Sequence, residues 1–187
     1  MPKPLHGIRV LDLTNVLAGP FCCHHLAHLG AEVIKVEAAG RGDLARQLGA
    51  DPDLSERHMG VSFLAQNAGK KSVTLNLKHP KGKALFLRLV DTADVLVENF
   101  RPGVMARLGL DHESLRDAHP RLIYCAISGF GQDGPWVHRP AYDQIIQGAS
   151  GAMSITGDKD TAPLRAGYPV ADTVGGLTAA FALSLIH

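Results

Sequence analysis

Four short apolar runs constrain the fold more than any other feature of this sequence. They are rich in Val, Ile and Leu and do not alternate with polar residues: Ile8–Leu13, Glu32–Glu37, Asp94–Glu98 and Leu122–Ser128. Runs of this kind are typical of strands that are covered on both faces, as in the centre of a parallel sheet. A fifth run, Ser72–Leu77, alternates in polarity, and we expect it at an edge of the same sheet.

Helical patterns lie between these runs. Strands that alternate with helices form βαβ units, so the fold class is predicted to be α/β, with a parallel sheet flanked by helices. The segment 40–69 is the least regular and is expected to be a loop with one short helix. The predicted helices are Phe21–Leu29, which follows Pro20, Pro80–Val90 with Leu85, Phe86 and Leu89 on one face, a short helix capped by Asp111 that ends near His119, and Thr173–Ile186.

Composition and charge exclude several classes of protein. Of the 187 residues, 45% are hydrophobic and 20% charged, which is ordinary for a globular domain. The formal net charge of +1 gives no general attraction to nucleic acid or to an anionic membrane. The longest apolar run, Leu177–Ile186, is too short to span a bilayer and is interpreted as a buried helix. The segment Met1–Gly7 lacks the apolar stretch of a signal peptide, and the three cysteines have no CxxC spacing, so we expect a reduced, cytoplasmic protein.

Two motifs favour a plain interpretation over a chemical one. Gly129–Gly134 fits GxGxxG and follows a predicted strand. A dinucleotide fingerprint must open a helix, however, and Pro135 and Pro140 prevent a long helix from starting there, so we expect a flexible loop near a site. His24 and His28 have a spacing that can hold a metal, but no third ligand is evident. We interpret them as packing or surface residues and expect no metal site.

Basic residues gather at the predicted strand ends. Ligands of open α/β sheets bind at the carboxyl ends of strands, and the guanidinium fork of Arg suits phosphate. From the residues alone, a solvated surface and a site for an anionic small molecule are both open. The residues concerned are Lys70, Lys71, Lys78, Arg101 and Arg107.

Asp172 precedes a glycine-rich apolar helix. As an N-cap, its carboxylate would accept a backbone N–H and contribute about 1 kcal/mol. As a nucleophile, it would be kept ionised by the same amides and the helix dipole. Gly175 and Gly176 would then let a bulky substrate approach. The local sequence alone favours the cap.

The balance changes when the segments are read together. Twelve segments, spread over nearly the whole chain, occur in the same order as in one known protein family. They are residues 4–14, 18–20, 29–37, 42–43, 67, 70–78, 93–103, 128–131, 142–143, 150–151, 156–157 and 170–172. In this order they resemble the N-terminal part of the family III CoA-transferases, the CaiB/BaiF type. Each match alone is weak, but the ordered set is specific. The helical pattern runs into His187 without a C-cap, so we expect a single domain over residues 1–187 in a truncated chain.

The resemblance implies a fold and an assembly. The fold is a Rossmann-like parallel sheet flanked by helices, the N-terminal part of a CaiB/BaiF-type large domain that binds CoA. In this family, later sequence supplies a small domain and a return segment, and two full-length subunits form an interlocked homodimer. The resemblance implies no tightly bound cofactor, because coenzyme A is a substrate.

The resemblance also implies roles for individual residues. Asp172 matches the aspartate that becomes acylated, and Tyr142 and Asp143 match residues that line the acyl site. Arg139 is a further candidate for CoA contact. One basic family position is Ala38 here, for which Arg41 is a candidate substitute. The implied CoA contacts are Leu17, Ala18, Leu75, Asn76, Leu77, Lys78, Asn99, Phe100, Arg101 and Arg107.

The implied activity is transfer of CoA from an acyl-CoA donor to a carboxylic acid through an aspartyl-CoA thioester, a form of covalent catalysis. Three alternatives stay open. These alternatives are an acyl-CoA racemase of the same superfamily, a catalytically silent CoA-binding fragment and a dinucleotide oxidoreductase. Racemases of the superfamily carry a histidine where this chain has Tyr142, and racemisation needs an acid and a base on opposite faces of a carbon. Tyr142 therefore favours transfer.

Overall fold

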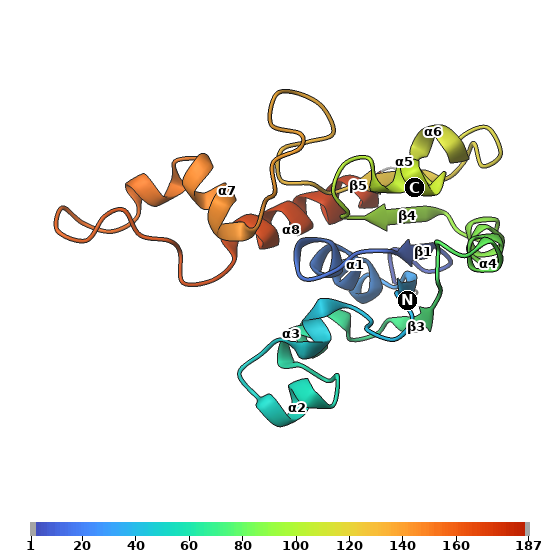
Figure 1. The fold of residues 1–187 in the computed structure, drawn as a ribbon, viewed down its shortest axis with the longest axis horizontal. Helices are drawn as coiled ribbons and strands as arrows, with labels where there is room; N and C mark the ends of the chain where they lie inside the picture. The colour runs from blue at the N-terminus through green and yellow to red at the C-terminus, as the bar shows by residue number, and fades with distance from the viewer. Residues whose placement is uncertain (1–2, 186–187) are drawn as a thin grey trace.

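One parallel sheet of five strands forms the centre of the molecule (Figure 1). The computed structural model describes residues 3–185. The strand order is β3-β2-β1-β4-β5, which is the doubly wound Rossmann order, and β3 lies at the edge as expected. The predicted parallel α/β sheet is confirmed. The strands are β1 (Arg9–Asp12), β2 (Glu32–Glu37), β3 (Lys71–Thr74), β4 (Val95–Glu98) and β5 (Ile123–Ala126).

Helices occupy most of the connections between the strands. The irregular segment 40–69 contains three short helical turns rather than one, and α5, α7 and η2 were not expected from the sequence. The α-helices are α1 (Ala18–His28), α2 (Pro52–Glu56), α3 (Val61–Asn67), α4 (Pro80–Val90), α5 (Val104–Leu108), α6 (His112–Leu115), α7 (Asp143–Ala149) and α8 (Val170–Ser184), and the 3-10 helices are η1 (Leu44–Gln47) and η2 (Ala152–Ile155).

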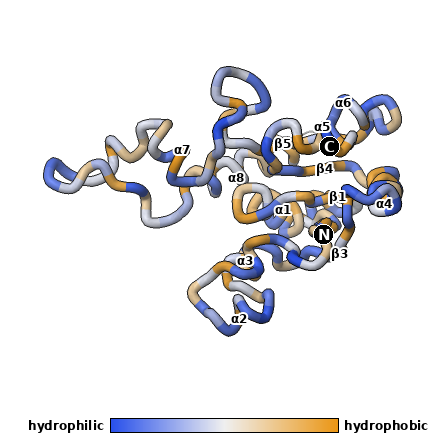
Figure 2. Tube along the Cα trace, viewed as in Figure 1, coloured by the Kyte–Doolittle hydropathy of each residue, from blue (hydrophilic) through white to orange (hydrophobic). Residues whose placement is uncertain are grey.

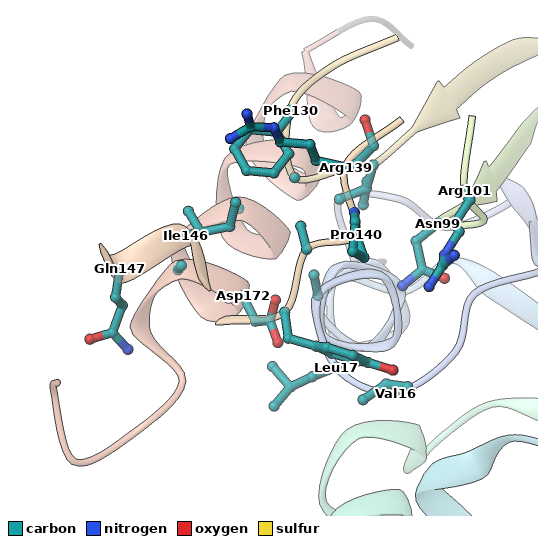
Figure 3. A pocket seen from close by; sticks show the side chains of 18 of the residues that line it. Val16, Leu17, Asn99, Arg101, Phe130, Arg139, Pro140, Ile146, Gln147 and Asp172 are labelled. Carbon is teal, nitrogen blue, oxygen red and sulfur yellow. The ribbon is translucent and has the colours of Figure 1, made fainter. Parts of the chain in front are cut away.

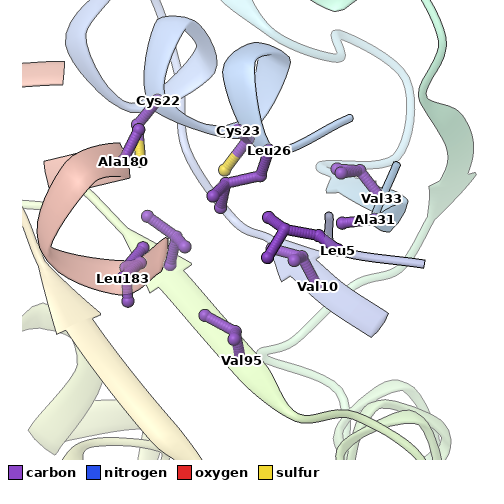
Figure 4. Close-up of a cluster of buried hydrophobic side chains, with 11 residues drawn as sticks. Leu5, Val10, Cys22, Cys23, Leu26, Ala31, Val33, Val95, Ala180 and Leu183 are labelled. Atoms are coloured by element: carbon purple, nitrogen blue, oxygen red, sulfur yellow. The ribbon is translucent and has the colours of Figure 1, made fainter. Parts of the chain in front are cut away.

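Two hydrophobic clusters cover the two faces of the sheet. Neighbouring strand residues point to opposite faces, so Val10 belongs to one cluster and Leu11 to the other, and both are fully buried. Figure 4 shows the first cluster, which includes Val10 and Val95 of the sheet, Cys22 of α1 and Leu183 of α8. The second cluster packs the other face against α4, α5 and α6. The central strands are mainly apolar because both faces of the sheet are covered there, whereas the edge strand β3 is largely exposed.

Helix boundaries and faces differ from the expectations in four places. α1 begins at Ala18, three residues early, because the first N–H groups of a helix have no internal partner and Pro20 is tolerated there. Asp111 caps α6 as expected, but that helix ends at Leu115. Leu85 was expected on the buried face of α4, yet it is 47% exposed beside the buried Phe86.

The fourth difference concerns α8, which was expected to be a buried helix. Only its face of small and apolar residues is covered, and within the described residues nothing covers the other face. That exposed stripe is Val174, Leu177, Phe181 and Leu185, from 52% to 67% exposed. The helix begins at Val170 rather than Thr173, and its expected end at Ile186 lies outside the described residues.

Part of the chain lies outside the two layers. Figure 1 shows α7 and the segments on either side of it projecting from the sheet, where they join β5 to α8. In Figure 2, the projecting segment ends in a hydrophilic tip, whereas the strands are mainly apolar. None of the described helices combines the length and the apolar character that crossing a membrane requires.

Candidate active site

A cleft of about 660 Å³ opens at the carboxyl ends of β1, β4 and β5, where α8 begins. This is where open α/β sheets bind their ligands. Figure 3 shows Asp172 between α8 and the loop that carries Leu17, with Asn99 and Arg101 on the β4 side and Phe130 on the β5 side. Segments that are more than 150 residues apart in the chain therefore meet at one carboxylate.

Asp172 lies in the first turn of α8, as its third residue. The residue at the N-cap is Pro169, whose side chain has no acceptor, and the Asp172 carboxylate accepts no backbone N–H among the residues that the structure describes. The cap interpretation of Asp172 is therefore wrong. The helix starts three residues earlier than the sequence suggested, so Asp172 projects from the turn into the cleft.

The capping carboxylate comes from another helix. Oδ1 of Asp143, the first residue of α7, accepts the N–H of Ala171 at 2.8 Å and the N–H of Asp172 at 3.4 Å. Asp143 is 5% exposed, and it does not line the cleft. Tyr142, its neighbour, does line the cleft and is 59% exposed. Tyr142 therefore faces the cleft, whereas the buried Asp143 faces the first turn of α8.

The environment of Asp172 makes its carboxyl unusually basic. Burial disfavours the charged form, and the negative charge of Asp143 adds to this effect, so that the pKa of Asp172 rises to about 6. Within residues 3–185 the carboxylate has no cationic partner. Above pH 6 it is an ionised carboxylate without a counter-charge, next to open space. Such a group is available to react with a bound electrophile.

The loop between β1 and α1 lines the wall opposite Asp172 and is held by hydrogen bonds to two side chains, Asn99 and the buried Asp43. Asn99 binds Asn15 reciprocally: the Asn15 N–H donates to Asn99 Oδ1, and Asn99 Nδ2 donates to the Asn15 carbonyl, both at 2.8 Å. Val16 has φ of 68°, a left-handed conformation that is strained for a β-branched residue. Its N–H donates to Asp43 Oδ1 at 3.0 Å. Such strain persists where the surroundings over-determine the backbone.

A buried ion cluster lies beneath this loop. Lys35 Nζ lies 2.9 Å from Asp43 Oδ2 and donates to the Thr14 carbonyl at 2.7 Å. Lys70 Nζ donates to Asp12 Oδ2 at 2.8 Å. Burial opposes ionisation of Asp12, but Lys35 and Lys70 outweigh it, so the pKa of Asp12 lies below its ordinary value. The cluster fixes one wall of the cleft.

The cleft gathers some of the residues that the sequence assigned to CoA and leaves others outside. Leu75, Asn76, Leu77 and Lys78 lie on the loop after β3, and Arg107 lies on α5. None of these five lines the cleft. The residues that do line it are Leu17, Ala18, Asn99, Phe100 and Arg101, together with Arg139, whose guanidinium lies 4.5 Å from the centre of the Trp136 ring.

The basic residues divide into two kinds. Lys70 is buried in the ion cluster, and Lys71 pairs with Glu32 on the surface, so both are occupied by protein partners. Lys78, Arg101 and Arg107 are exposed. The exposed residues remain the candidates for an anionic ligand.

The structure also places the two motifs that were given plain interpretations. No helix follows Gly129–Gly134 directly, since the next begins at Asp143, and Ser128–Phe130 line the cleft. His24 and His28 face each other with 2.9 Å between their Nε2 atoms. Among residues 3–185, no three His, Cys, Asp or Glu side chains gather in a way that could hold a metal ion.

Sequence reasoning missed several residues around the cleft. Val16 and Ile146 line it, and Gln147, also in the lining, is a fully buried polar residue on α7. The signal for Asp43 and Lys35 was present, since charged residues inside an apolar strand or beside one require buried partners. No local signal marks Gln147, because α7 itself has no clear apolar period.

Comparisons with known proteins agree with this geometry. A profile described as CoA-transferase family III matches residues 5–186. The succinate–glutarate CoA-transferase of Agrobacterium fabrum is 48% identical over 98% of this chain and 47% of its own length. The acetyl-CoA:oxalate CoA-transferase of Acetobacter aceti is 49% identical over 94% of this chain and 45% of its own length.

The solved structures agree as well. A CaiB/BaiF family protein from Brucella suis has a TM-score of 0.90 and 40% identity, covering 100% of this chain and 50% of its own. A hypothetical protein from Mycobacterium tuberculosis has a TM-score of 0.86 and 41% identity, over 97% of this chain and 49% of its own. The chain spans about half the length of the curated relatives it matches. On the fold, the cleft and these matches together, the chain belongs to CoA-transferase family III.

Proposed function

We propose that this chain carries the CoA-binding cleft and the nucleophile of an enzyme that moves CoA from an acyl-CoA to a carboxylic acid, with Asp172 as the catalytic residue. One observation supports this most strongly. Asp172 projects into the cleft from a helix N-terminus, with a pKa of about 6 and, among residues 3–185, no cationic partner. A carboxylate in this state is ionised at neutral pH and is not neutralised by a neighbour.

The proposed reaction proceeds through two kinds of covalent intermediate. The Asp172 carboxylate attacks the thioester carbonyl of the donor, giving a mixed anhydride and the CoA thiolate. The thiolate then attacks the aspartyl carbonyl, which gives an aspartyl-CoA thioester and releases the donor acid. The acceptor carboxylate attacks this thioester and forms a second anhydride, from which the thiolate takes the acceptor acyl group and frees Asp172. Splitting a difficult exchange in this way is covalent catalysis.

The chain offers groups for the CoA end of the substrate. Exposed Lys78, Arg101 and Arg107 provide positive charge beside the strand ends, which suits phosphate groups. Coenzyme A is then a substrate. Asn99 contributes by holding the Asn15 backbone in the cleft wall, because both its amide atoms are already bonded there.

We further propose a short dicarboxylic acid as one substrate. Succinate, glutarate and oxalate appear in the names of the relatives. In this chain, Arg101 and Arg139 line the cleft and are both exposed, so either can receive a second carboxylate. Monocarboxylic acids of the same length would lack that ion pair.

The cleft favours transfer over racemisation. Of the described residues that line it, none is a histidine, and Asp172 is the one carboxylate. Racemisation requires a second acid–base group on the opposite face of the substrate carbon. Tyr142 lines the cleft at the position where the related racemases carry a histidine.

The test is a covalent adduct on Asp172. The complete protein is incubated with succinyl-, glutaryl-, acetyl- and formyl-CoA, and intact mass is measured together with peptide mapping. We expect an added mass of CoA less water on the peptide that contains Asp172, and none in Asp172→Asn. Asp117→Asn, which alters a carboxylate that is 93% exposed and outside the cleft lining, is the matched control and should label normally. Absence of an adduct with all four donors would refute the proposal.

Two further features support proposals about the assembly and the compartment. The exposed apolar stripe on α8 suits a covered face, and we propose that the complete protein is a homodimer that covers it. Light scattering of the complete protein tests this, and a monomer would contradict it. Cys22, Cys23 and Cys125 are free thiols, which suits a reduced, cytoplasmic location.

A further inference from the structure

The segment that leads into α8 is joined to α7 by two buried side chains. After η2 the chain runs through residues 156–169 without regular structure and then turns into α8. Asp143 and Gln147 lie one turn apart on α7, and both are more than nine-tenths buried. Each of them binds a backbone N–H of the incoming segment, at Ala171 and Ala166 respectively. The segment is therefore held at two points, five residues apart.

Each polar atom of the Asp143 and Gln147 side chains has a hydrogen-bond partner. Asp143 Oδ1 accepts from Ala171, while its Oδ2 accepts from Gln147 Nε2 at 2.6 Å. Gln147 Oε1 accepts the N–H of Ala166 at 2.8 Å. Because the amide has one donor end and one acceptor end, its orientation is fixed by its two partners.

These contacts complete the N-terminus of α8. The first N–H groups of a helix need partners outside it, and Pro169 at the N-cap cannot supply one. Val170 donates to the Tyr168 carbonyl, and Thr173 donates to the Pro169 carbonyl. The two groups between them donate to Asp143. Asp143 therefore replaces the missing cap from a different helix.

We propose that Gln147, acting through Asp143, is a positioning residue for Asp172: the pair clamps residues 166–172 onto α7 and sets the turn from which the nucleophile projects. The inference rests on the proposed function in one respect, namely that Asp172 is the reacting group. The negative charge of Asp143 also reaches Asp172 and disfavours its ionisation. The clamp thus fixes the position of the nucleophile and contributes to its basicity.

Energetics explain why the pair acts as a unit. A hydrogen bond to a charged group is stronger than a neutral one, and removal of a partner leaves a buried polar atom without its bond. Loss of the Gln147 amide would free the Ala166 tether and one oxygen of Asp143 together. The interaction between the two side chains is therefore measurable as non-additivity.

The experiment exchanges the polarity of the pair. Gln147→Glu places two carboxylates in contact, and Asp143→Asn places two amide donors in contact, so each single variant breaks the clamp. In the double variant, the new Asn side chain donates to the new Glu side chain, which can still accept from Ala166. We expect amide exchange at Ala166 and Ala171 to accelerate at least tenfold in each single variant and to return to within about threefold of wild type in the double variant.

Two further measurements keep the result interpretable. Exchange at Val10 and Val95, in the central strands, should not change, which excludes general unfolding. Gln147→Met, which keeps the volume without the amide, should accelerate exchange as the single variants do. Titration of the Asp172 side-chain carbon by NMR should give a lower pKa in Asp143→Asn, because a negative charge has been removed.

The outcomes separate this inference from the proposed function. None of these readouts requires turnover, so they stand even where no acyl-CoA forms an adduct. Unchanged exchange at Ala171 in Gln147→Glu and Gln147→Met, or a double variant that only adds the two single effects, would overturn the clamp. In the complete enzyme the single variants should lower kcat with little change in KM for acyl-CoA, and the double variant should restore kcat.

Discussion

Asp12 and Asp172 are two carboxylates near the same end of the sheet, in opposite electrostatic surroundings. Asp12 is fully buried at the end of β1, and the ammonium groups of Lys35 and Lys70 hold its pKa below the ordinary value despite burial. Asp172 is half-buried at the start of α8, where burial and Asp143 raise its pKa to about 6. The presence or absence of cationic partners, and not burial alone, sets the difference. The charge of Asp12 is balanced by lysines, whereas the Asp172 carboxylate has no such partner among the described residues and can react with a substrate.

The largest expected effect tests the reactive side of this comparison. Asp172→Asn removes the nucleophile while preserving its shape, and should lower CoA transfer by on the order of a thousandfold or more. Steady-state assays of the complete protein with a succinyl-CoA donor measure the loss. Transfer within tenfold of wild type would show that Asp172 is not the reacting group.

The next effect tests the structural side. Lys35→Met leaves Asp12 and Asp43 buried without their shared cation, and removal of one partner of a buried ion pair costs about 3–5 kcal/mol. Urea unfolding measures the free energy of unfolding. Lys71→Met is the matched control, because the Lys71–Glu32 pair lies on the surface and should contribute less than about 1 kcal/mol. An equal loss of unfolding free energy in the two variants would show that the buried ion cluster contributes no more to stability than the surface ion pair.

A pair of adjacent glycines tests how α8 is held on the α1 side. A Cβ on Gly176 would lie 2.4 Å from the Ala18 carbonyl oxygen, so Gly176→Ala should destabilise by about 1–3 kcal/mol through overpacking. Gly175 lines the cleft and has open space, so Gly175→Ala should stabilise the helix by up to about 1 kcal/mol. Thermal unfolding of both variants measures this, and effects of the same sign would contradict the packing.

The smallest effect is a dependence of stability on pH. Because the folded-state pKa of Asp172 is raised, ionisation destabilises the fold as pH rises from about 4 to about 6, and the full cost is present above that range. Asp172→Asn should therefore be more stable than wild type at pH 8, by about 1 kcal/mol once solvent screening is allowed for. At pH 4 this advantage should vanish. Urea unfolding at both values decides, and a constant difference would argue against the raised pKa.

The sequence predicted the sheet better than its surroundings. The four apolar runs became β1, β2, β4 and β5, because two-sided burial leaves a continuous pattern that needs no tertiary knowledge. The short helices between residues 40 and 69 carried too few residues for a clear period. The exposed stripe on α8 was misjudged for another reason, since an apolar helix looks the same whether one face or both are covered.

The candidate site was likewise predicted only in part. The family resemblance pointed to Asp172 and Tyr142, and both line the cleft. Asp143 was assigned to the acyl site on the same grounds, and its carboxylate instead faces the first turn of α8. That contact joins residues 28 positions apart and leaves no local pattern. Asn99 is comparable, because its amide serves the Asn15 backbone 84 positions away.

The strand order has a consequence for folding during synthesis on the ribosome. β1 lies in the middle of the sheet, yet its partner β4 follows 85 residues later, as the pairing of Val10 with Val95 shows. At translation speeds of 5–20 residues per second, that gap lasts about 4–17 s. During this interval one side of β1 has no neighbour to pair with, and an unpaired strand edge of this kind exposes an incomplete chain to aggregation.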